Sequence, residues 1–236
     1  MSTRNTSQQA TGQPPHNAHP YEGADCHGGS DSSKTLVAGS RRIALAGAPN
    51  AGKTSIYNAL TGLHAKTGNY PGVTVQRSLG TCKIGNTTLT IEDLPGAYSL
   101  DPISPDEEIV HDVLTGTSTT VSAPDALVIV VDATTLQRGM NFIAEALALD
   151  LPTCLVVTMT DELTRRSGRL DVAALGQALG IPAVRVVGNR GIGLPELRKR
   201  LTEVADWQRP PLAPPTTPSE VASWADSILA AADYEA

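Results

Sequence analysis

Short apolar runs that alternate with helix-like segments most constrain what this chain of 236 residues can fold into. Three such runs, IALAG, DALVIVVD and TCLVVTM, have the length of buried strands. Segments with helical character lie near residues 53–61, 105–115, 138–149, 171–179 and 194–205. Parallel strands need a crossover that is usually a helix. The order therefore predicts an α/β fold with helices on both faces of a mostly parallel sheet.

The unit between the first two runs has a different pattern. VQRSLGTCKIG and TTLTIED alternate apolar with polar residues around a short turn at Gly85-Asn86. This is typical of a β-hairpin, because such turn residues connect antiparallel strands. We therefore expect six or seven strands in all, with one antiparallel edge on the otherwise parallel sheet.

The chain divides into three parts by composition. Residues 1–38 are polar and lack apolar periodicity, so we expect a disordered tail. A weak metal-collecting arm is the alternative for this tail, with ligands from His16, His19, Cys26 and His27. Residues 39–206 have the pattern of one globular domain, and residues 207–236 form a proline-rich spacer and a short helix.

That last helix has an apolar stripe that it cannot bury alone. The segment EVASWADSILAAAD is preceded by Ser219 as a possible N-cap. Its stripe consists of Val221, Trp224, Ile228 and Leu229. The helix must dock on the domain, on a second copy of the chain, or on sequence beyond this chain.

Charge and cysteine content limit the classes of function. The formal net charge of −6 does not favour a nucleic-acid partner. The three cysteines, Cys26, Cys82 and Cys154, are scattered and odd in number, which indicates no disulfide framework and fits a reducing compartment. No run approaches about 18 consecutive apolar residues, so we expect the chain itself to be soluble.

The segment GAPNAGKT, from Gly47 to Thr54, has the spacing of a phosphate-binding loop between a strand and a helix. Glycines let the backbone wrap a phosphate, the lysine reaches the β- and γ-phosphate oxygens, and the threonine hydroxyl binds Mg²⁺. A glycine turn without a ligand is the alternative. The expected nucleotide contacts are Gly47, Ala48, Pro49, Asn50, Ala51, Gly52, Lys53, Thr54 and Ser55.

Two downstream segments narrow the type of nucleotide site. IEDLPG gives Asp93-x-x-Gly96, in which the aspartate can hold Mg²⁺ through water and the glycine N–H can meet the γ-phosphate. The loop KTGNYPGVT offers Thr74 as a second hydroxyl for the same metal. In this order they predict a GTPase with two switch loops, in which Lys53, Thr74 and Gly96 take part in hydrolysis.

GAPNAGKTSIYNALTG, NYPGVTV, DLPGAYSL and VVDATTLQRGMNF together resemble the cytosolic GTPase domain of FeoB-type ferrous iron transporters. The resemblance extends from about Arg42 to Val204. It implies a Ras-like P-loop GTPase attached to a membrane transporter domain beyond residue 236, at the cytoplasmic face of the bacterial inner membrane, and allows a homo-oligomer. No residue of the chain itself indicates iron.

The chain departs from the family pattern at three places. Ala48 stands where the family often has asparagine, and Thr158 stands where its base-reading motif Asn-x-x-Asp begins. The family usually has a large helical domain before the membrane, whereas the sequence after Val204 offers one helix. We therefore expect no inhibitor-like role for that part of the chain.

Hydrolysis is expected to be slow. The position at which Ras-like proteins carry a water-orienting glutamine is Ala97. Asn50 matches the asparagine that helps to bind K⁺ in potassium-activated relatives, and K⁺ would supply the charge of an arginine finger. The alternative is that Asn50 only hydrogen-bonds the backbone of its own loop.

The base-reading segment is VVTMTDEL. An ionised Asp161 can accept both N1–H and the exocyclic amine of guanine, whereas adenine presents an acceptor at N1. Thr158 and Met159 complete this side, and Gly188 with Asn189 is expected to face guanine O6. Because Thr158 is shorter than asparagine, we predict a guanine preference with affinity weakened roughly tenfold. A purely structural Asp161, capping the next segment, is the alternative.

Two other functions remain open from the sequence. One is a soluble Era-like GTPase in RNA or ribosome assembly, against which the acidity of the chain counts. The other is a nucleotide-binding switch with negligible catalysis.

Overall fold

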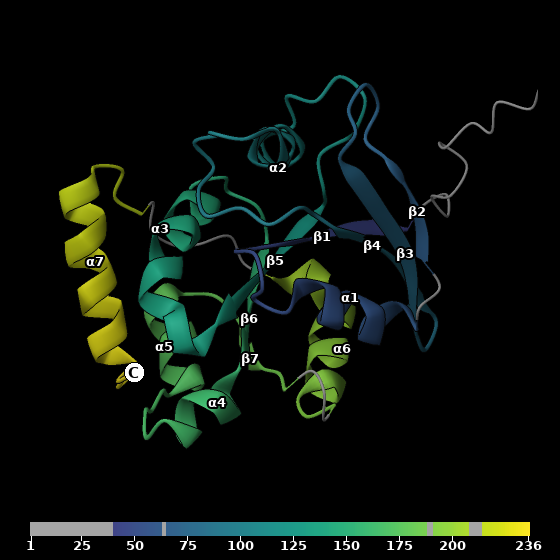
Figure 1. Cartoon of the computed structure of the whole chain (residues 1–236). Coiled ribbons are helices and arrows are strands. Elements are labelled where there is room, and N and C mark those ends of the chain that lie inside the picture. The colour runs from purple at the N-terminus through teal and green to yellow at the C-terminus, as the bar shows by residue number, and fades with distance from the viewer. Residues whose placement is uncertain (1–39, 63–64, 188–190, 208–213) are drawn as a thin grey trace, which may run out of the picture. The chain divides into compact units, whose positions relative to one another are not determined.

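The apolar runs form the centre of a seven-stranded sheet (Figure 1). The structure is a computed structural model that describes residues 40–62, 65–187, 191–207 and 214–236. The predicted N-terminal tail, with its possible metal ligands, lies outside the described residues. All described residues belong to one unit of the chain, residues 32–236.

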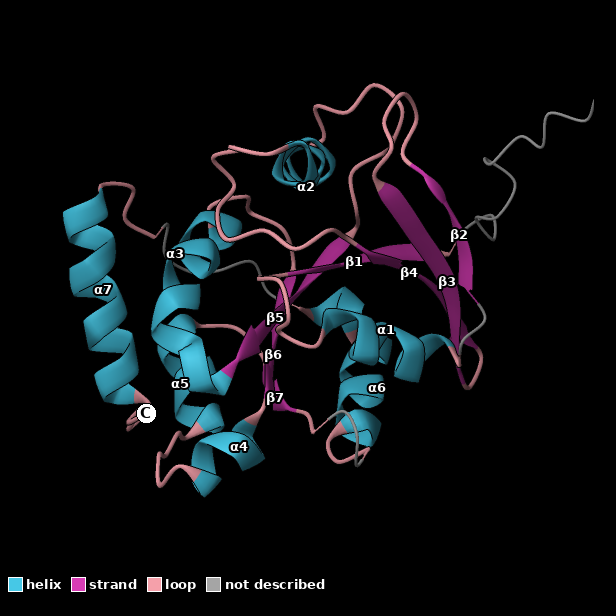
Figure 2. Ribbon diagram, in the orientation of Figure 1, coloured by secondary structure: helices cyan, strands magenta, loops and turns pink. Residues whose placement is uncertain are grey.

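The strands are β1 (Arg41–Ala46), β2 (Ala65–Asn69), β3 (Gln76–Ile84), β4 (Thr87–Asp93), β5 (Ala126–Asp132), β6 (Thr153–Thr158) and β7 (Ala183–Arg185). Their order in the sheet is β2-β3-β4-β1-β5-β6-β7. The pairs from β4 to β7 are parallel, and β2-β3 and β3-β4 are antiparallel (Figure 2). The predicted mixed sheet with one antiparallel edge is confirmed.

The sequence predicts a loop over residues 66–74, whereas the structure has the edge strand β2 in its first part. In the structure β2 pairs with β3 from Ala65↔Gly80 to Asn69↔Gln76. An edge strand has one neighbour and little to bury, so it shows no apolar alternation that would reveal it. Its formation pairs backbone groups of β3 that would otherwise lie at the open edge.

The helices are α1 (Lys53–Thr61), α2 (Pro105–Thr115), α3 (Leu136–Leu147), α4 (Thr160–Arg165), α5 (Val172–Leu179), α6 (Leu194–Thr202) and α7 (Pro218–Ala231), with short 3-10 turns η2 (Ala133–Thr135) and η4 (Val204–Asp206). The five helices expected within the domain are present. The added helix α4 spans 6 residues, too few to show periodicity. Within the described ranges, none of the helices is long and apolar enough to cross a membrane.

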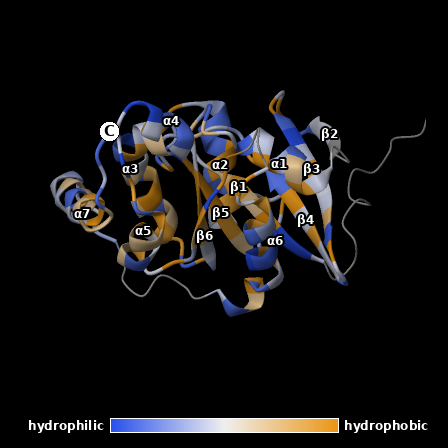
Figure 3. Cartoon of the chain, turned by 90° about the horizontal axis from the view of Figure 1, so that it is seen from below, coloured by the Kyte–Doolittle hydropathy of each residue, from blue (hydrophilic) through white to orange (hydrophobic). Residues whose placement is uncertain are grey.

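The helices cover both faces of the sheet, as predicted. On one face α1 and α6 pack against β1 and β5; their buried side chains include Ile56, Leu60, Leu197 and Leu201. On the other face lie α2, α3 and α5, with side chains that include Val110, Met140, Ile143 and Leu175. Figure 3 shows the apolar colouring concentrated on the strands between these layers.

The C-terminal helix α7 docks on the domain, which is the first of the three partners considered above. It contacts α3 and α5, on the opposite side of the sheet from α1 and α6 (Figure 1). Burial of Ile228 and Leu229 contributes about 1.5–3 kcal/mol for each side chain. The N-cap is Thr217 and not Ser219, because Pro218 occupies the first helical turn, where its missing N–H costs nothing.

Candidate functional site

The loop from Gly47 to Gly52 leads from β1 into α1 and depends on its glycines. Gly47 has φ of 142°, and a Cβ there would lie 2.1 Å from the carbonyl oxygen of Val130. Gly52 has φ of 90° and forms the N-cap of α1 without a side-chain hydrogen bond. The first N–H groups of α1 therefore stay available at a helix N-terminus, which favours an anion.

Lys53 is buried, with 7% of its surface exposed, and its Nζ donates to the carbonyl oxygen of Ala48 at 3.2 Å. Burial lowers the pKa of Lys53, and the nearby Asp93 opposes that shift. Asp93 compensates only part of the positive charge of this buried ammonium group. A phosphate would provide the negative partner that it lacks.

Thr54 and Asp93 come together at the end of the sheet. Thr54 Oγ1 donates to Asp93 Oδ2 at 2.9 Å. The other carboxylate oxygen, Asp93 Oδ1, is buried and has no hydrogen-bond partner among the described residues. Burial raises the pKa of Asp93, while the bond from Thr54 and the charge of Lys53 lower it. A buried carboxylate oxygen without a partner, beside a hydroxyl, fits a hydrated Mg²⁺ ion.

Thr74 lies in the exposed loop between β2 and β3. This loop is closed at its base, because Tyr70 N donates to the Val75 carbonyl at 2.9 Å and Val73 N to the Tyr70 carbonyl at 3.2 Å. Among the described residues, no hydrogen bond joins Thr74 to Thr54 or Asp93. The structure thus brings two of the three predicted Mg²⁺ residues into contact and leaves the third on its loop.

Gly96 and Ala97 lie directly against the P-loop. A Cβ on Gly96 would be 2.7 Å from Pro49 Cγ and 2.9 Å from Pro49 Cα. Ala97 N donates to the Gly47 carbonyl at 3.1 Å, and the Ala97 side chain is fully buried. Only glycine fits at position 96, and a glutamine at position 97 would have to displace packed atoms.

The segment after Ala97 is held by two carboxylates that the sequence does not reveal. Glu145 of α3 accepts from Ser99 Oγ at 2.9 Å and from the backbone N–H of Leu100. Glu107 of α2 accepts from Tyr98 N at 3.3 Å and from Ile103 N at 3.2 Å. Only the capping-box spacing from Ser104 to Glu107 could have signalled this role.

Asn50 lies in the P-loop with φ of 63° and is exposed. Within the described part of the chain its side chain makes no hydrogen bond, so it does not bond the backbone of its own loop. A cavity of about 220 Å³ adjoins it. The lining includes Pro49, Asn50, Tyr98, Asp132, Arg138 and Phe142.

A second cavity, of about 420 Å³, lies where β6 meets α1. It is lined by Gly52, Ser55, Ile56, Thr158, Met159, Asp161, Glu162, Arg165 and Val187. Asp161 is half-buried in the first turn of α4, whose N-cap is Met159 with φ of 54° and no side-chain cap bond. Asp161 is therefore not the N-cap of that helix. Gly188 and Asn189 lie outside the described residues.

Thr158 is buried and joins the two sides of the site. Its Oγ1 lies 2.8 Å from the Ala51 carbonyl oxygen and 2.9 Å from that of Val131. One hydroxyl proton serves one acceptor at a time, so these bonds alternate. Thr158 therefore ties β6 to the P-loop and to β5.

Comparison with known proteins identifies close relatives. Residues 41–201 match the family model described as ferrous iron transport protein B, FeoB_N. The Fe(2+) transporter FeoB of Leptospira biflexa is 37% identical over 169 residues, which cover 72% of this chain and 24% of that protein. The Fe(2+) transport protein A/Fe(2+) transporter FeoB fusion protein of Porphyromonas gingivalis is 40% identical over 163 residues, which cover 69% of this chain and 19% of that protein. The chain thus spans about a quarter or less of the length of these relatives.

Solved structures of FeoB domains are also similar to this chain. The cytosolic domain of T. maritima FeoB in apo form superposes with a TM-score of 0.67 and 34% identity, covering 73% of this chain and 66% of that one. The T. maritima FeoB G domain gives 0.63 and 35%, covering 70% and 98%. A GDP-bound mutant G domain of S. thermophilus FeoB gives 0.63 and 34%, covering 72% and 62%. The fold is that of a Ras-like P-loop GTPase.

Proposed function

Because this chain belongs to the FeoB family of ferrous iron transport proteins, we propose that it binds GTP and GDP, hydrolyses GTP, and thereby regulates ferrous iron uptake through an attached membrane transporter. The observation that carries the proposal is the pair formed by Thr54 and Asp93. A buried carboxylate oxygen without a partner, next to a P-loop hydroxyl and Lys53, has the composition of a magnesium–phosphate site.

Different residues of the site bind the phosphates and the Mg²⁺ ion. The P-loop from Gly47 to Ser55 wraps the phosphates with its backbone N–H groups, and Lys53 neutralises the β- and γ-phosphate oxygens. Thr54 and, through water, Asp93 would hold Mg²⁺, which supplies positive charge to the phosphate oxygens. In the triphosphate state Thr74 would supply a second hydroxyl to this ion, and the Gly96 N–H would meet the γ-phosphate.

The base occupies the cavity beside β6. Asp161 accepts the two donors of guanine, Met159 contacts the ring, and Thr158 fixes the distance between this strand and the P-loop. For Gly188 and Asn189, which lie outside the described residues, the contact with guanine O6 stays a prediction from the sequence. The GDP-bound structures of S. thermophilus FeoB support a guanine nucleotide in this pocket.

Hydrolysis is slow and stimulated by K⁺. Ala97 is buried and offers no group to the attacking water. Asn50 is exposed at the P-loop with a side chain free to bind a monovalent cation, whose charge takes the place of an arginine finger.

The partner is the membrane-embedded part of the same protein, so this domain acts at the cytoplasmic face of the bacterial inner membrane. The FeoB relatives are transporters several times longer than the matched segment, which supports this arrangement. Assembly into a homo-oligomer is compatible with it. No feature of the site favours the Era-like alternative, and the family match counts against it.

Single-turnover hydrolysis of GTP in the presence of Mg²⁺ tests the proposal. We expect slow, Mg²⁺-dependent release of phosphate, and we expect Lys53→Ala to weaken nucleotide binding strongly. Tight binding of GTP without any turnover would instead support the switch with negligible catalysis. Binding of RNA with no binding of GTP would contradict the proposal.

A further inference from the structure

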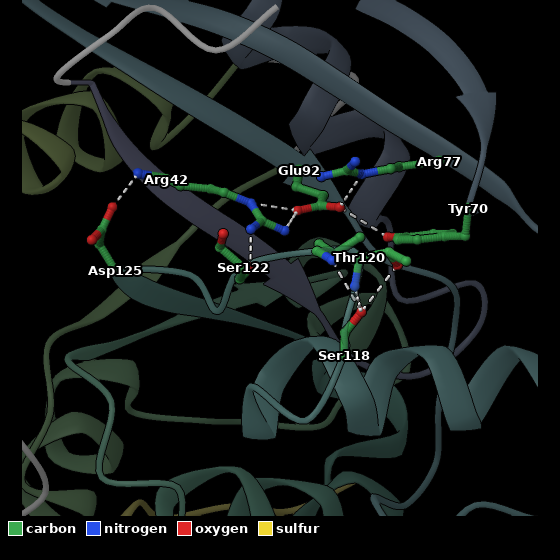
Figure 4. Close-up of polar contacts among 9 residues, drawn as sticks. Arg42, Tyr70, Arg77, Glu92, Ser118, Thr120, Ser122 and Asp125 are labelled. Atoms are coloured by element: carbon green, nitrogen blue, oxygen red, sulfur yellow. Dashed lines mark hydrogen bonds and ion pairs between the residues drawn. The ribbon is translucent and has the colours of Figure 1, made fainter. Parts of the chain in front are cut away.

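A buried carboxylate, Glu92 on β4, accepts hydrogen bonds from four donor atoms in three other parts of the fold (Figure 4). Glu92 Oε2 accepts from Arg42 Nε at 2.7 Å and also from Arg42 Nη2. Glu92 Oε1 accepts from Tyr70 Oη at 3.0 Å and from Arg77 Nε at 2.8 Å. Burial, and then Glu92, raises the pKa of Tyr70, so its hydroxyl stays protonated and donates.

Two of these donors flank the loop that carries Thr74. Tyr70 stands at the beginning of this loop and Arg77 follows it on β3, and both donate to the same oxygen of Glu92. The Arg77 guanidinium carbon also lies 5.6 Å from the centre of the Tyr70 ring. A single side chain therefore pins both ends of the loop to β4.

This attachment is costly to break. Glu92 is fully buried, and a buried carboxylate that loses hydrogen-bond partners is left with an uncompensated charge. Tyr70 is 4% exposed and belongs to the same apolar core cluster as residues of α2 and α3. A movement of Thr74 is therefore easier within residues 71–75, which include Gly72 with φ of 82°, than by release of Tyr70.

Glu92 is also next to Asp93 in the chain, and successive side chains of a strand point to opposite faces. Glu92 faces Tyr70, whereas Asp93 faces Thr54 at the start of α1. The end of β4 thus carries the anchor of the Thr74 loop on one face and the magnesium-facing carboxylate on the other.

We propose that Glu92 is a positioning residue for the triphosphate state, because it fixes both ends of the Thr74 loop so that Thr74 closes over the metal by pivoting within residues 71–75. This inference rests on the proposed GTPase function. Without the anchor, more of the chain must be ordered each time the loop closes, which disfavours the closed state. The diphosphate state does not need Thr74 and is unaffected.

Tyr70→Phe tests the anchor, since it removes one hydroxyl and keeps the ring. We expect GDP affinity to stay the same and affinity for a non-hydrolysable GTP analogue to fall by about fivefold or more. Tyr57→Phe is the matched control, because Tyr57 is equally buried and its hydroxyl has no hydrogen-bond partner in the part of the chain that the structure describes. It should leave the ratio of the two affinities unchanged.

A double-variant cycle separates positioning from general destabilisation. In a Thr74→Ala background, Tyr70→Phe should produce no further loss of analogue affinity, because the contact that it positions is already absent. Equal losses for GDP and the analogue, or a lower Tm with an unchanged affinity ratio, would overturn the inference. If Thr74→Ala itself fails to separate the two nucleotides, the proposed metal closure is wrong and this inference falls with it. If only Tyr70→Phe fails, the proposed function stands.

Discussion

Thr158 Oγ1 lies 2.8 Å from the carbonyl oxygen of Ala51, so a side chain on the base side of the site is hydrogen-bonded to the P-loop. The same hydroxyl reaches the Val131 carbonyl on the neighbouring strand β5. The side chain at position 158 therefore links β6 to β5 and to the P-loop. Its length and chemistry determine how strongly these three segments of the nucleotide pocket are held together.

Substitutions at Thr158 should separate this tie from contact with the base. Thr158→Ala should lower the free energy of unfolding by about 0.5–1.5 kcal/mol and weaken nucleotide binding, because one buried hydrogen bond is lost. Thr158→Asn should instead tighten GTP and GDP binding roughly tenfold, as expected if one more hydrogen bond reaches the base. Denaturant unfolding measures the change in stability, and calorimetric titration measures the nucleotide affinities.

Thr153→Ala is the control for these variants. Thr153 is a buried threonine on the same strand, and it donates to the Leu151 carbonyl at 2.8 Å, near the start of the strand. It should change stability but not nucleotide affinity. A loss of GTP affinity in Thr153→Ala as large as that in Thr158→Ala would show that the effect is not specific to the P-loop tie.

Thr74→Ala should leave GDP binding largely intact and slow GTP hydrolysis. The P-loop, Lys53 and Thr54 hold the phosphates in both states, while Thr74 acts only when its loop closes. Single-turnover rates and GDP titration give the two quantities. Loss of GDP binding in this variant would make Thr74 a structural residue.

Replacement of Na⁺ by K⁺ should accelerate GTP hydrolysis, and Asn50→Ala should remove the difference between the two ions. The measurement is the single-turnover rate in matched chloride salts at constant ionic strength. A rate that does not depend on the monovalent ion in the unmodified protein would rule out the role given to Asn50.

Ala97→Gln should not restore fast hydrolysis. The Ala97 side chain is fully buried, so a glutamine would overpack this region and lower the free energy of unfolding by about 1–3 kcal/mol. Tyr98→Gln, at the exposed neighbouring position, should leave Tm nearly unchanged and serves as the control. An Ala97→Gln protein with unchanged Tm and faster turnover would contradict the packing argument.

The nucleotide-free protein should depend on pH through Asp93. Burial is the largest cause of the raised pKa of this carboxyl, so its ionised form is disfavoured in the folded state. Protonation of Asp93 therefore stabilises the folded state at pH values below the ordinary aspartate pKa. This stabilisation is lost as the pH rises through the raised folded-state pKa of Asp93. Asp93→Asn should consequently raise the apo Tm at neutral pH, an advantage that disappears in acid.

The same variant should lose Mg²⁺-dependent nucleotide binding, which gives the prediction a second measurement. Tm recorded against pH without nucleotide, and GDP titration with and without Mg²⁺, check the two parts. A lower apo Tm for Asp93→Asn at neutral pH would mean that the ionised carboxylate stabilises the empty site.

The sequence predicts the parts of this fold that depend on local pattern. The alternation of apolar runs gave the sheet and its helices, and the glycine spacing gave the P-loop, because both are set by neighbouring residues. Edge strand β2 and the short helix α4 were missed, since neither buries a periodic face. Thr217 takes the cap expected at Ser219, because Pro218 fits the first helical turn.

The contacts that organise the site are not local, and the sequence does not show them. Glu92 lies in a strand with alternating polarity, where a charged residue normally faces solvent. Its burial depends on Arg42, 50 positions away, and on Tyr70, 22 positions away. The tie from Thr158 to Ala51 spans 107 positions, so its strength could not be judged from residue type alone.

Asp161 is the residue that we propose to read guanine. The decisive measurement is the affinity of the unmodified protein for GTP and for ATP, together with the affinity of Asp161→Asn for guanine and xanthine nucleotides. We predict clear preference for GTP over ATP, and a shift of the variant toward xanthine nucleotides, because an asparagine can donate to the xanthine oxygen that replaces the guanine amine. Equal binding of GTP and ATP by the unmodified protein would contradict the account.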